Sequence, residues 1–405
     1  MAENQIRGTE SQDCPSIRVR ITGGGDTPEA PLSDVNFYDY DGKRVASYTA
    51  ADFAALDAMP ANPSHQGLTA QGWNWSLSDA KAYVAKYGRL IIGQQYITDD
   101  GKTRLYINIA TKGRMSPSIY WTQTAANGVI INWGDGSAEE TVAGTGDKSL
   151  SHTYALPGEY VIILEVSDGN AELGNSNNIS VLGDNSNANK IYLNMLKKAE
   201  IGDNIEMLAS SFRESGIRQI TITQGMELPS NTFNLTKLEY ITIHEGSTTI
   251  GTGTFNSNDK IKAVSLPNGI ISVGSSCFAL LSPEESPTLP DTMTGIANSC
   301  FNGLTSSSLT IPDGITSIGT SSFINCVNLA ILTIPASVTT ISATAFSSCY
   351  GMAEYHFKGT TPPTITANTF NNIPADCKIY VPASAVATYQ GATNWSTYAS
   401  QIVGE

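Results

Sequence analysis

Basic residues are scarce in this chain, and one long stretch lacks them altogether. Of the 405 residues, 23 are Lys or Arg and 37 are Asp or Glu, which gives a formal net charge of −14. No Lys or Arg occurs between Ala263 and Phe357. Nucleic-acid binding needs a basic face that neutralises phosphates. The sequence therefore argues against a nucleic-acid partner, most strongly for that stretch.

Metal-binding patterns are absent as well. No CxxC occurs, and the four histidines lie far apart, so no zinc site is predicted. Two cysteine pairs repeat at an interval of 23 residues, and we predict that their members are free, buried thiols. Disulfides between neighbouring turns are the alternative. The six cysteines are Cys14, Cys277, Cys300, Cys326, Cys349 and Cys377.

Long hydrophobic runs are missing too. No window approaches the roughly 18 apolar residues of a membrane span. The N-terminal segment MAENQIRGTESQDCPSIRVRI contains no apolar stretch of the signal-peptide type. We therefore expect either that a leader is missing from this chain or that another route carries the protein outside the cell.

Catalytic motifs are not found. The sequence has no GxSxG, HExxH, Walker loop or GxGxxG, and His244 and His356 are more than 100 residues apart. Asp39, Asp41 and Gly42 are similar to the start of a calcium loop, but the remaining oxygen ligands of such a loop are missing. We predict that the protein is not an enzyme and that it has no cofactor and no metal.

Composition and turn signals divide the chain into six parts. We predict a tail or linker at 1–32, a small α+β domain at 33–110, a β-rich unit at 111–172, a connector and solenoid start at 173–195, repeats at 196–375, and a C-terminal cap at 376–405.

Turn and capping signals are clear in the α+β domain. The alternating stretch VNFYDYDGKRVASYT contains Asp41-Gly42, which predicts a hairpin. The segment SLSDAKAYVAKYG predicts a helix with Ser76 as its N-cap and Gly88 as its C-cap. A second hairpin is predicted around residues 99–101 in RLIIGQQYITDDGKTRLYINI.

Two tryptophans in QGWNWS, Trp73 and Trp75, are two residues apart. Side chains two apart on an extended segment face the same side. They form either part of a core, which is the favoured interpretation, or an exposed platform on which a sugar stacks.

From Leu196 onward one pattern recurs: apolar, two residues, apolar, one residue, apolar, and then a phenylalanine 11 to 13 residues later. One such unit cannot bury its apolar side alone, so the units must stack. We predict a solenoid of about eight coils, in which the LxxLxL segments are strands that pair into a parallel sheet on the concave face. A proline at the seventh position ends the strand in several coils. The phenylalanines, at spacings of 21 to 24 residues, are Phe212, Phe233, Phe255, Phe278, Phe301, Phe323, Phe346 and Phe370.

The repeats resemble the BspA-like leucine-rich repeat, whose consensus is LxxIxIPxxVxxIGxxAFxxC. The segment LAILTIPASVTTISATAFSSC (Leu329–Cys349) fits it almost position by position, whereas earlier repeats lack the IP and the Cys. The segment DCKIYVPASAVATYQGATNWSTYASQIV is similar to the C-terminal cap of such proteins. The resemblance implies a bacterial surface protein that binds host proteins, glycans or other cells.

Two further resemblances concern the N-terminal half. WGDGS (133–137), HTY (152–154) and GEYVIILEV (158–166) resemble a PKD domain, an immunoglobulin-like sandwich that serves as a spacer or adhesive module. This implies a PKD-like β-sandwich at 111–172. Repeats behind a YDYDG…GWNWS unit are also similar to bacteriophage proteins of gut bacteria. The alternative to a cell-surface adhesin is therefore a virion protein whose residues 1–110 contact other virion proteins.

The third and fifth positions of each LxxLxL segment point away from the core, because side chains alternate along a strand. We call these positions the strand face. Their Ser and Thr residues are either ordinary solvated strand residues or a hydroxyl ladder that binds an extracellular protein or glycan ligand. The predicted ligand-binding residues are Tyr240, Ser286, Thr288, Ser308, Thr310, Ile331, Thr333, Glu354 and His356.

Overall fold

The computed structural model describes residues 32–110, 115–124, 126–183, 190–222 and 225–405. Nearly all of the predicted tail and Cys14 lie outside these residues. None of the helices in the described ranges combines the length and the apolar character that crossing a lipid bilayer requires.

The α+β domain has a four-stranded sheet in the order β2-β1-β4-β3. The predicted first hairpin is confirmed, with Gly42 at a φ of +82° in its turn. The predicted helix is confirmed as α2, since the Ser76 side chain accepts from the Asp79 N–H and Gly88 is left-handed. The elements are β1 (Val35–Tyr38), β2 (Arg44–Tyr48), α1 (Ala50–Ala54), β3 (Leu68–Trp73), α2 (Leu77–Tyr87) and β4 (Leu90–Thr98).

Trp73 and Trp75 belong to the core of this domain. Their exposed fractions are 7% and 4%, so neither is a platform for a sugar. Trp73 packs edge-on against Phe37, and Trp75 packs edge-on against Tyr83 of α2. The predicted core role is confirmed.

The predicted second hairpin is wrong. β4 pairs with β1 and β3, whereas the next strand, β5 (Thr103–Ile109), joins a different sheet and pairs with β10 and β13. β4 is buried along nearly its whole length and already has a partner on each edge. No edge is left for β5, and the turn at residues 99–101 carries the chain into the next unit.

The β-rich unit consists of two sheets that share a core. One contains β5, β10, β7 and β8, and the other contains β12, β6, β11 and the additional strand β9. The remaining strands of the unit are β6 (Ser118–Gln123), β7 (Val129–Asn132), β8 (Glu140–Val142), β9 (Gly146–Ser151), β10 (Gly158–Val166), β11 (Ala171–Leu173) and β12 (Leu182–Gly183).

Both sheets continue into the solenoid. β5 pairs antiparallel with β13 (Leu196–Ile201), and β11 pairs parallel with β14 (Ile205–Met207), so each sheet of the β-rich unit extends across the first coil. A solenoid end exposes unpaired strand edges and its core, and such ends need a cap. The β-rich unit is that cap, and one hydrophobic core runs from Leu105 to Ile402.

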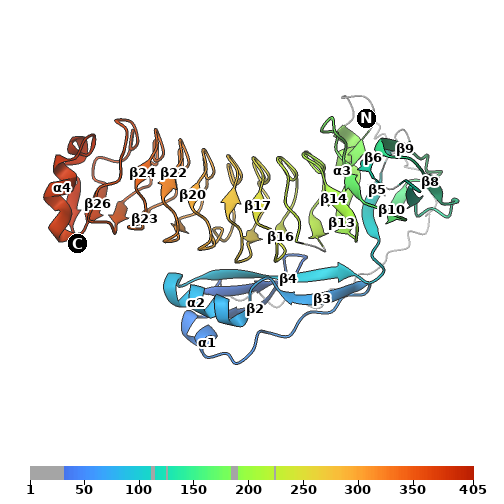
Figure 1. Ribbon diagram of the computed structural model, residues 1–405, viewed down its shortest axis with the longest axis horizontal. Helices are drawn as coiled ribbons and strands as arrows, with labels where there is room; N and C mark the ends of the chain where they lie inside the picture. Colours follow the sequence, from blue (N-terminus) through green and yellow to red (C-terminus); the bar gives the residue numbers. More distant parts are fainter. Residues whose placement is uncertain (1–31, 111–114, 125, 184–189, 223–224) are drawn as a thin grey trace, which may run out of the picture. The chain divides into compact units, whose positions relative to one another are not determined.

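The solenoid has about 9 turns of parallel strands that run side by side (Figure 1). Strand-face strands after β13 are β15 (Gln219–Ile222), β16 (Tyr240–Thr242), β18 (Ala263–Ser265), β21 (Ser308–Thr310), β23 (Ile331–Ile334), β25 (Glu354–Phe357), β26 (Lys378–Val381) and β27 (Ile402–Gly404). A second series of short strands follows: β17 (Thr249–Ile250), β19 (Ser272–Val273), β20 (Gly295–Ile296), β22 (Ser317–Ile318) and β24 (Thr340–Ile341).

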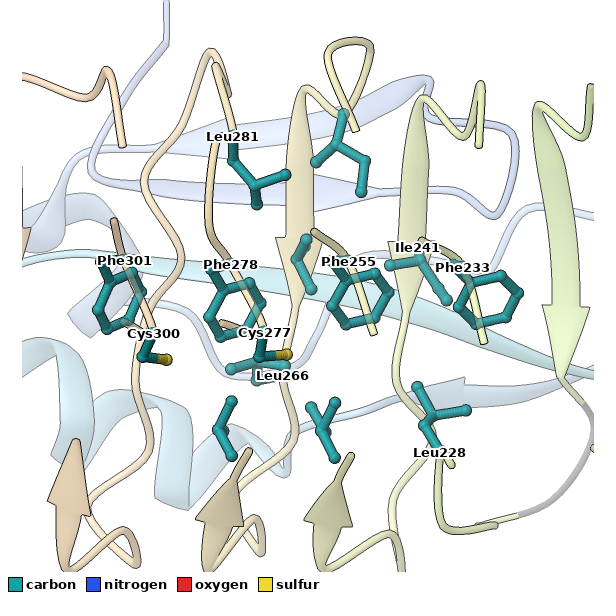
Figure 2. Packing of buried hydrophobic residues seen from close by; sticks show 14 of the residues in the cluster. Leu228, Phe233, Ile241, Phe255, Leu266, Cys277, Phe278, Leu281, Cys300 and Phe301 are labelled. Carbon is teal, nitrogen blue, oxygen red and sulfur yellow. The ribbon is translucent and has the colours of Figure 1, made fainter. Parts of the chain in front are cut away.

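The predicted phenylalanine ladder is confirmed. All eight rings are buried, and each stacks on the next with centroids 5.3–5.9 Å apart. Figure 2 shows four successive rings, Phe233 to Phe301, in one file. Interplanar angles of 10° to 21° show that neighbouring rings are nearly parallel. One ring per coil therefore forms a continuous aromatic file through the solenoid.

The cysteines of the repeats lie beside this file, and Cys277 and Cys300 are adjacent to Phe278 and Phe301 in Figure 2. Five described cysteines are free and buried, as predicted for the two repeated pairs. The Cys326 thiol donates to the Phe301 carbonyl at 3.1 Å. Burial raises the pKa of the Cys300 thiol to about 12, so this thiol stays protonated at neutral pH.

The strand-face strands do not form one sheet: β15 and β16 belong to separate sheets, and a second interruption lies at the fifth coil. Residues 284–289 form no strand, and β18 and β21 on either side belong to separate sheets. Pro287 occupies the fourth position of this coil, where other coils have an apolar strand residue. Proline cannot donate to a ladder. The prediction of one unbroken parallel sheet therefore fails at this coil.

The C-terminal cap adds strands to the sheet of the last coils. β26 and β27 extend it in parallel beyond β25. Trp395 and Tyr389 are buried in the cap, and Trp395 packs edge-on against Phe357 of the eighth coil. The other cap elements are η1 (Ala383–Ala385), α4 (Val386–Gly391) and η2 (Trp395–Tyr398), and α3 (Lys190–Met195) precedes the first coil.

Candidate functional site

The strand face is divided into a covered part and an open part. In the first five coils most of its side chains are buried, and in the sixth to eighth coils none is. The buried members are Glu200, Thr221, Tyr240, Ala263, Ser265, Ser286 and Thr288, and the partly or fully exposed members of the later coils are Ser308, Thr310, Ile331, Thr333, Glu354 and His356. The α+β domain covers the first part.

Prolines at the seventh position leave backbone carbonyls unpaired on the covered surface. In the eighth coil this position is Lys358, whose N–H donates to the sixth-position carbonyl of the preceding coil, that of Ile334, at 3.0 Å. Proline has no N–H. The prolines at 267, 290, 312 and 335 therefore leave four carbonyls without their partner in the sheet, namely those of Ile243, Leu266, Leu289 and Ile311.

Three of these carbonyls accept hydrogen bonds from the α+β domain. The Ile243 carbonyl accepts from Asn74 Nδ2 at 3.1 Å. The Leu266 carbonyl accepts from Trp75 Nε1 at 2.8 Å.

The third bond comes from helix α2, whose Tyr83 hydroxyl donates to the Leu289 carbonyl at 2.7 Å. In the described ranges no side chain of this domain donates to the Ile311 carbonyl. Buried carbonyls need partners, so the domain replaces donors that three prolines removed.

Close packing completes the cover. The ring of Tyr38 stacks on that of Tyr240 at 5.1 Å, and both belong to a small apolar cluster with Ile91 and Ala263. Gly93 of β4 lies against Tyr240 and Thr242, and a Cβ atom there would clash with the Thr242 Oγ1. Only glycine allows the strand to come this near to the solenoid.

One buried carboxylate lies in this interface. Glu285, in the interrupted fifth coil, accepts hydrogen bonds from Tyr38 Oη and from Asn36 Nδ2, the latter at 2.9 Å. Burial raises the pKa of Glu285 above its ordinary value, although both hydrogen bonds oppose the shift. The two donors satisfy a group that would otherwise be costly to bury.

Polar contacts surround the buried part. Arg89 donates to the Ser286 carbonyl at 3.1 Å and to Ser308 Oγ at 3.4 Å. Lys86 pairs with Asp313 at 3.1 Å between exposed side chains. Exposed pairs of this kind add little stability, so the carbonyl contacts and the stacked rings hold the domain in place.

This cover changes part of the predicted ligand-binding set. Tyr240 is 2% exposed and contacts the chain's own Tyr38, so the hypothesis that it lies at the edge of an open ligand surface does not fit the structure. Ser286 and Thr288 are buried at 5% and 2% exposure for the same reason. Sequence periodicity placed these three side chains on the correct face but did not reveal that the face is covered.

The open strip consists of the other six predicted residues. Ile331 at its centre is 51% exposed. Ser308 pairs in register with Ile331, and Ile331 with Glu354, so the third positions form one row. The strip thus presents hydroxyl groups around one exposed apolar side chain, and its role in binding remains a prediction.

His356 marks the end of the open strip. Its Nδ1 lies 2.6 Å from Glu405 Oε2, and its Nε2 lies 3.0 Å from Glu354 Oε2. The imidazole also stacks on Tyr380 at 4.8 Å. Both ring nitrogens are therefore engaged by the chain itself, and the exposed features here are the carboxylates and the aromatic edge.

Tyr380 was not among the predicted residues, because its segment was assigned to the cap. It lies on β26, which pairs with β25 so that Tyr380 is opposite His356. The sequence signal was present: Ile379 and Val381 continue the alternating pattern of the coils. The strand face therefore continues at least one strand further than predicted.

Across the described ranges, no group of three or more His, Cys, Asp or Glu side chains is arranged to hold a metal ion. Asp39, from the segment that is similar to the start of a calcium loop, accepts a hydrogen bond from Tyr96 Oη at 2.8 Å and pairs with His65 at 2.7 Å. These contacts give this carboxylate a structural role in the α+β domain.

Comparison with known proteins identifies the repeats. The model of the BspA type leucine rich repeat region matches residues 185–286 and 281–392 with 6 copies, which together cover about half of the chain. No curated protein matches the chain.

Solved structures similar to this chain include three bacterial proteins. A leucine-rich repeat protein from Bacteroides ovatus is 20% identical, with 53% of this chain and 67% of that chain covered and a TM-score of 0.38. A leucine rich cell surface protein from Faecalibacterium prausnitzii is 18% identical, with 51% and 63% covered and a TM-score of 0.33. The pneumococcal vaccine antigen PcpA is 14% identical, with 52% and 76% covered and a TM-score of 0.24. Likenesses at this level carry no functional argument.

Proposed function

Because the chain belongs to the BspA-type leucine-rich repeat family, we propose that it is a non-enzymatic recognition or adhesion protein that acts outside the cell. Its ligand is a protein or a glycan on another surface. No catalytic motif occurs in the sequence. The described ranges contain no metal-binding cluster that would add chemistry.

The observation that carries this proposal is the division of the strand face. The chain covers the first coils with its own α+β domain and leaves the sixth to eighth coils open. The side chains of the open strip are already ordered on paired strands, so binding there loses little entropy. Ile331, at 51% exposure, is the apolar anchor of the strip.

The test uses the full chain on a panel of immobilised glycans and extracellular matrix proteins. We expect binding to at least one of them, and we expect the double variant Thr310→Glu, Thr333→Lys to lose at least tenfold in affinity. Both positions are on the open strip, so the unfolding midpoint should stay unchanged. The matched control is Thr339→Lys, an exposed threonine outside the strip. If the double variant binds as well as the control, the strip is not the recognition surface.

A second candidate function is a virion protein that is anchored through residues 1–110. The sequence resemblance of the YDYDG…GWNWS unit to phage proteins motivates it. The α+β domain uses Asn74, Trp75 and Tyr83 on its own solenoid. A virion partner would therefore contact another surface of this domain, such as the partly exposed edge strand β2. Mass spectrometry of purified phage particles and of cell envelopes from the same culture separates the two functions.

We also propose that the β-rich unit is a PKD-like sandwich. His152 stacks on Trp133 at 4.8 Å and pairs with Asp135 at 2.7 Å, while Tyr154 donates to the Trp133 carbonyl at 2.9 Å. These contacts join the WGDGS and HTY segments into one cluster, and hydrogen bonds from Ser137 and His152 lower the pKa of Asp135 to about 2. In this function the unit is a rigid spacer that caps the repeats.

A further inference from the structure

The side of the solenoid that leads into the strand face changes its chemistry between the covered and the open coils. Two positions make up this side: the fourth residue after each phenylalanine and the second residue of each LxxLxL segment. In the third and fourth coils both positions are charged. Ion pairs run along them, from Lys237 to Asp259 at 3.4 Å and from Glu239 to Arg218 of the second coil at 3.2 Å. In the seventh and eighth coils the same positions are apolar, namely Val327, Ala330, Tyr350 and Ala353.

These apolar residues lie side by side. A Cβ atom at Gly351 would clash with the Val327 carbonyl, so the turn that carries Tyr350 packs directly against the turn of the preceding coil. Further along the coil, the Ala353 N–H donates to the Ala330 carbonyl at 2.8 Å. The next residue after Ala330 belongs to the open strip and is also apolar. We call this contiguous surface the shoulder patch, and it consists of Val327, Ala330, Ile331, Tyr350 and Ala353.

The large side chains of the shoulder patch are open to solvent. Val327 is 43% exposed and Tyr350 is 63% exposed. Single exposed apolar side chains are ordinary, but neighbouring ones mark surfaces that another molecule covers. The turn that carries Val327 is already held in place, because Asn328 Nδ2 donates to the Thr305 carbonyl of the preceding coil at 3.0 Å. Docking on this turn therefore costs little ordering entropy.

An acidic groove of about 710 Å³ adjoins the shoulder patch, and Asn328 belongs to its wall. The exposed residues Asp34 and Glu284 line the groove with their carboxylates. Arg89 is the basic residue among its described wall residues, and its guanidinium already donates to the Ser286 carbonyl at 3.1 Å. The groove therefore favours a cationic group over an anionic one.

The charges around the patch are negative on balance. Glu354 and Asp376 flank it on the far side, and Lys378 lies opposite Glu354 in the sheet. Glu284 has Lys262 at 3.9 Å, and this pair is exposed to solvent. No Lys or Arg occurs in the fifth to eighth coils, and the whole chain has a net charge of −14. Like charges therefore oppose a second copy of this chain on the patch, whereas a partner with basic residues around an apolar centre is complementary.

We propose that the shoulder patch docks a protein partner, whose apolar side chains cover Val327 and Tyr350 and whose neighbouring lysine or arginine enters the acidic groove. The proposal rests on the proposed recognition function and names its ligand as a protein with an apolar and basic contact segment. Tyrosine commonly dominates such interfaces, and a basic side chain beside Asp34 and Glu284 fixes the orientation of the partner. The recognition surface then extends beyond the open strip, with Ile331 common to both.

The experiment measures binding of the full chain to fluorescently labelled synthetic peptides by anisotropy. One set of peptides combines leucine, phenylalanine or tryptophan with lysine. A second set has glutamate in place of lysine, and a third has serine in place of the apolar residues. We expect at least one peptide of the first set to bind, and its counterparts in the other sets to bind at least tenfold more weakly. No binding in the first set, or equal binding of the lysine and glutamate counterparts, overturns the proposal.

Three variants locate the contact. Tyr350→Ser and Val327→Ser should each weaken binding of that peptide at least fivefold, because each removes an apolar contact. Both side chains are exposed, so the unfolding midpoint should stay unchanged. Glu284→Lys should reverse the charge preference, so that the glutamate counterpart binds more tightly than the lysine peptide. The matched control is Ile271→Ser, a 52% exposed position beside β19 on the second series of strands, which should bind as wild type does.

Wild-type affinity in Tyr350→Ser and Val327→Ser overturns the shoulder patch as the docking surface. Sedimentation velocity tests the other occupant, since self-association that Tyr350→Ser abolishes would assign the patch to a second copy and overturn the proposal. Failure here is distinguishable from failure of the proposed function. If the double variant at Thr310 and Thr333 loses binding to the immobilised panel while the shoulder variants bind normally, only the shoulder proposal falls. If neither set of variants affects binding, both proposals fall.

Discussion

The third to fifth coils and the sixth to eighth coils have the same repeat, the same phenylalanine file and the same outward positions, yet one set is covered and the other is open. The covered set carries Tyr240 and Ala263 where the open set carries Ser308 and Ile331. Prolines at the seventh position occur in both sets. The difference therefore does not come from the coil itself. It comes from the α+β domain, which donates hydrogen bonds to carbonyls of the third to fifth coils and packs closely on them through a glycine. The strand face of a leucine-rich repeat solenoid can thus be covered by another domain of the same chain.

The largest expected effect tests what the two sets have in common. Phe255→Ala in the covered set and Phe323→Ala in the open set each remove a fully buried ring from the file. Each should lower the free energy of unfolding by about 3–5 kcal/mol, the usual cost of deleting a buried phenyl ring. Urea denaturation measures both. A loss below about 1 kcal/mol for Phe323→Ala would mean that its ring is not in the core.

The next effect should appear only in the covered set. Tyr83→Phe removes the hydroxyl that serves the Leu289 carbonyl and leaves that carbonyl unpaired, which should cost about 1–3 kcal/mol. Hydrogen exchange at residues 240–243 should become faster, because the cover opens more often. Tyr350→Phe, at a 63% exposed site, is the matched control. Unchanged exchange in Tyr83→Phe would show that this contact does not hold the cover.

A pair of proline substitutions compares the two sets directly. Pro290→Ala restores an N–H that competes with Trp75 for the Leu266 carbonyl, whereas Pro335→Ala restores one that faces the Ile311 carbonyl without a competitor. Both variants gain similar unfolded-state entropy. Pro335→Ala should therefore be more stable relative to wild type than Pro290→Ala by about 1 kcal/mol, the net worth of one hydrogen bond. Equal values in urea denaturation would contradict the proline explanation.

The smallest effect is a pH dependence confined to the cover. The raised pKa of Glu285 means that the covered state binds its proton more tightly than the unfolded state does. This contribution to stability is complete below the ordinary pKa and is lost as the pH rises through the raised one. The urea midpoint of unfolding should therefore be higher at about pH 5 than at about pH 8 in wild type. In Glu285→Gln this difference between the two pH values should be smaller. The same pH response in both proteins would refute this role.

The sequence was informative wherever structure depends on neighbours along the chain or on the repeat. Ser76 and Gly88 fixed both ends of α2, and a phenylalanine every 21 to 24 residues predicted a file of stacked rings. Alternation predicted correctly which way the side chain of Thr333 points. These features follow from local capping and from stacking of equivalent positions, both of which a single sequence expresses.

The cover was not predictable in the same way. Asn74 and Trp75 contact coils more than 160 residues away, and no periodic pattern records such a pairing. Two weak signals existed: Ala263 at a position that is usually polar, and Glu285 between two prolines. The predicted hairpin at residues 99–101 failed for a related reason, because β4 was already paired on both edges.

Helix α2 contacts consecutive coils with side chains one helical turn apart. Tyr83 bonds the Leu289 carbonyl of the fifth coil, and Tyr87, four residues later, accepts from the Asp313 N–H of the sixth at 3.1 Å. Four helical residues rise about 6 Å, whereas neighbouring strands lie about 4.8 Å apart. The helical rise exceeds the strand spacing by about 1.2 Å per coil. Side chains one helical turn apart therefore align with about two successive coils and are out of register with the next. Coils added beyond the sixth would lengthen the exposed surface without altering the covered part. The number of coils can therefore change without changing the contacts of the α+β domain.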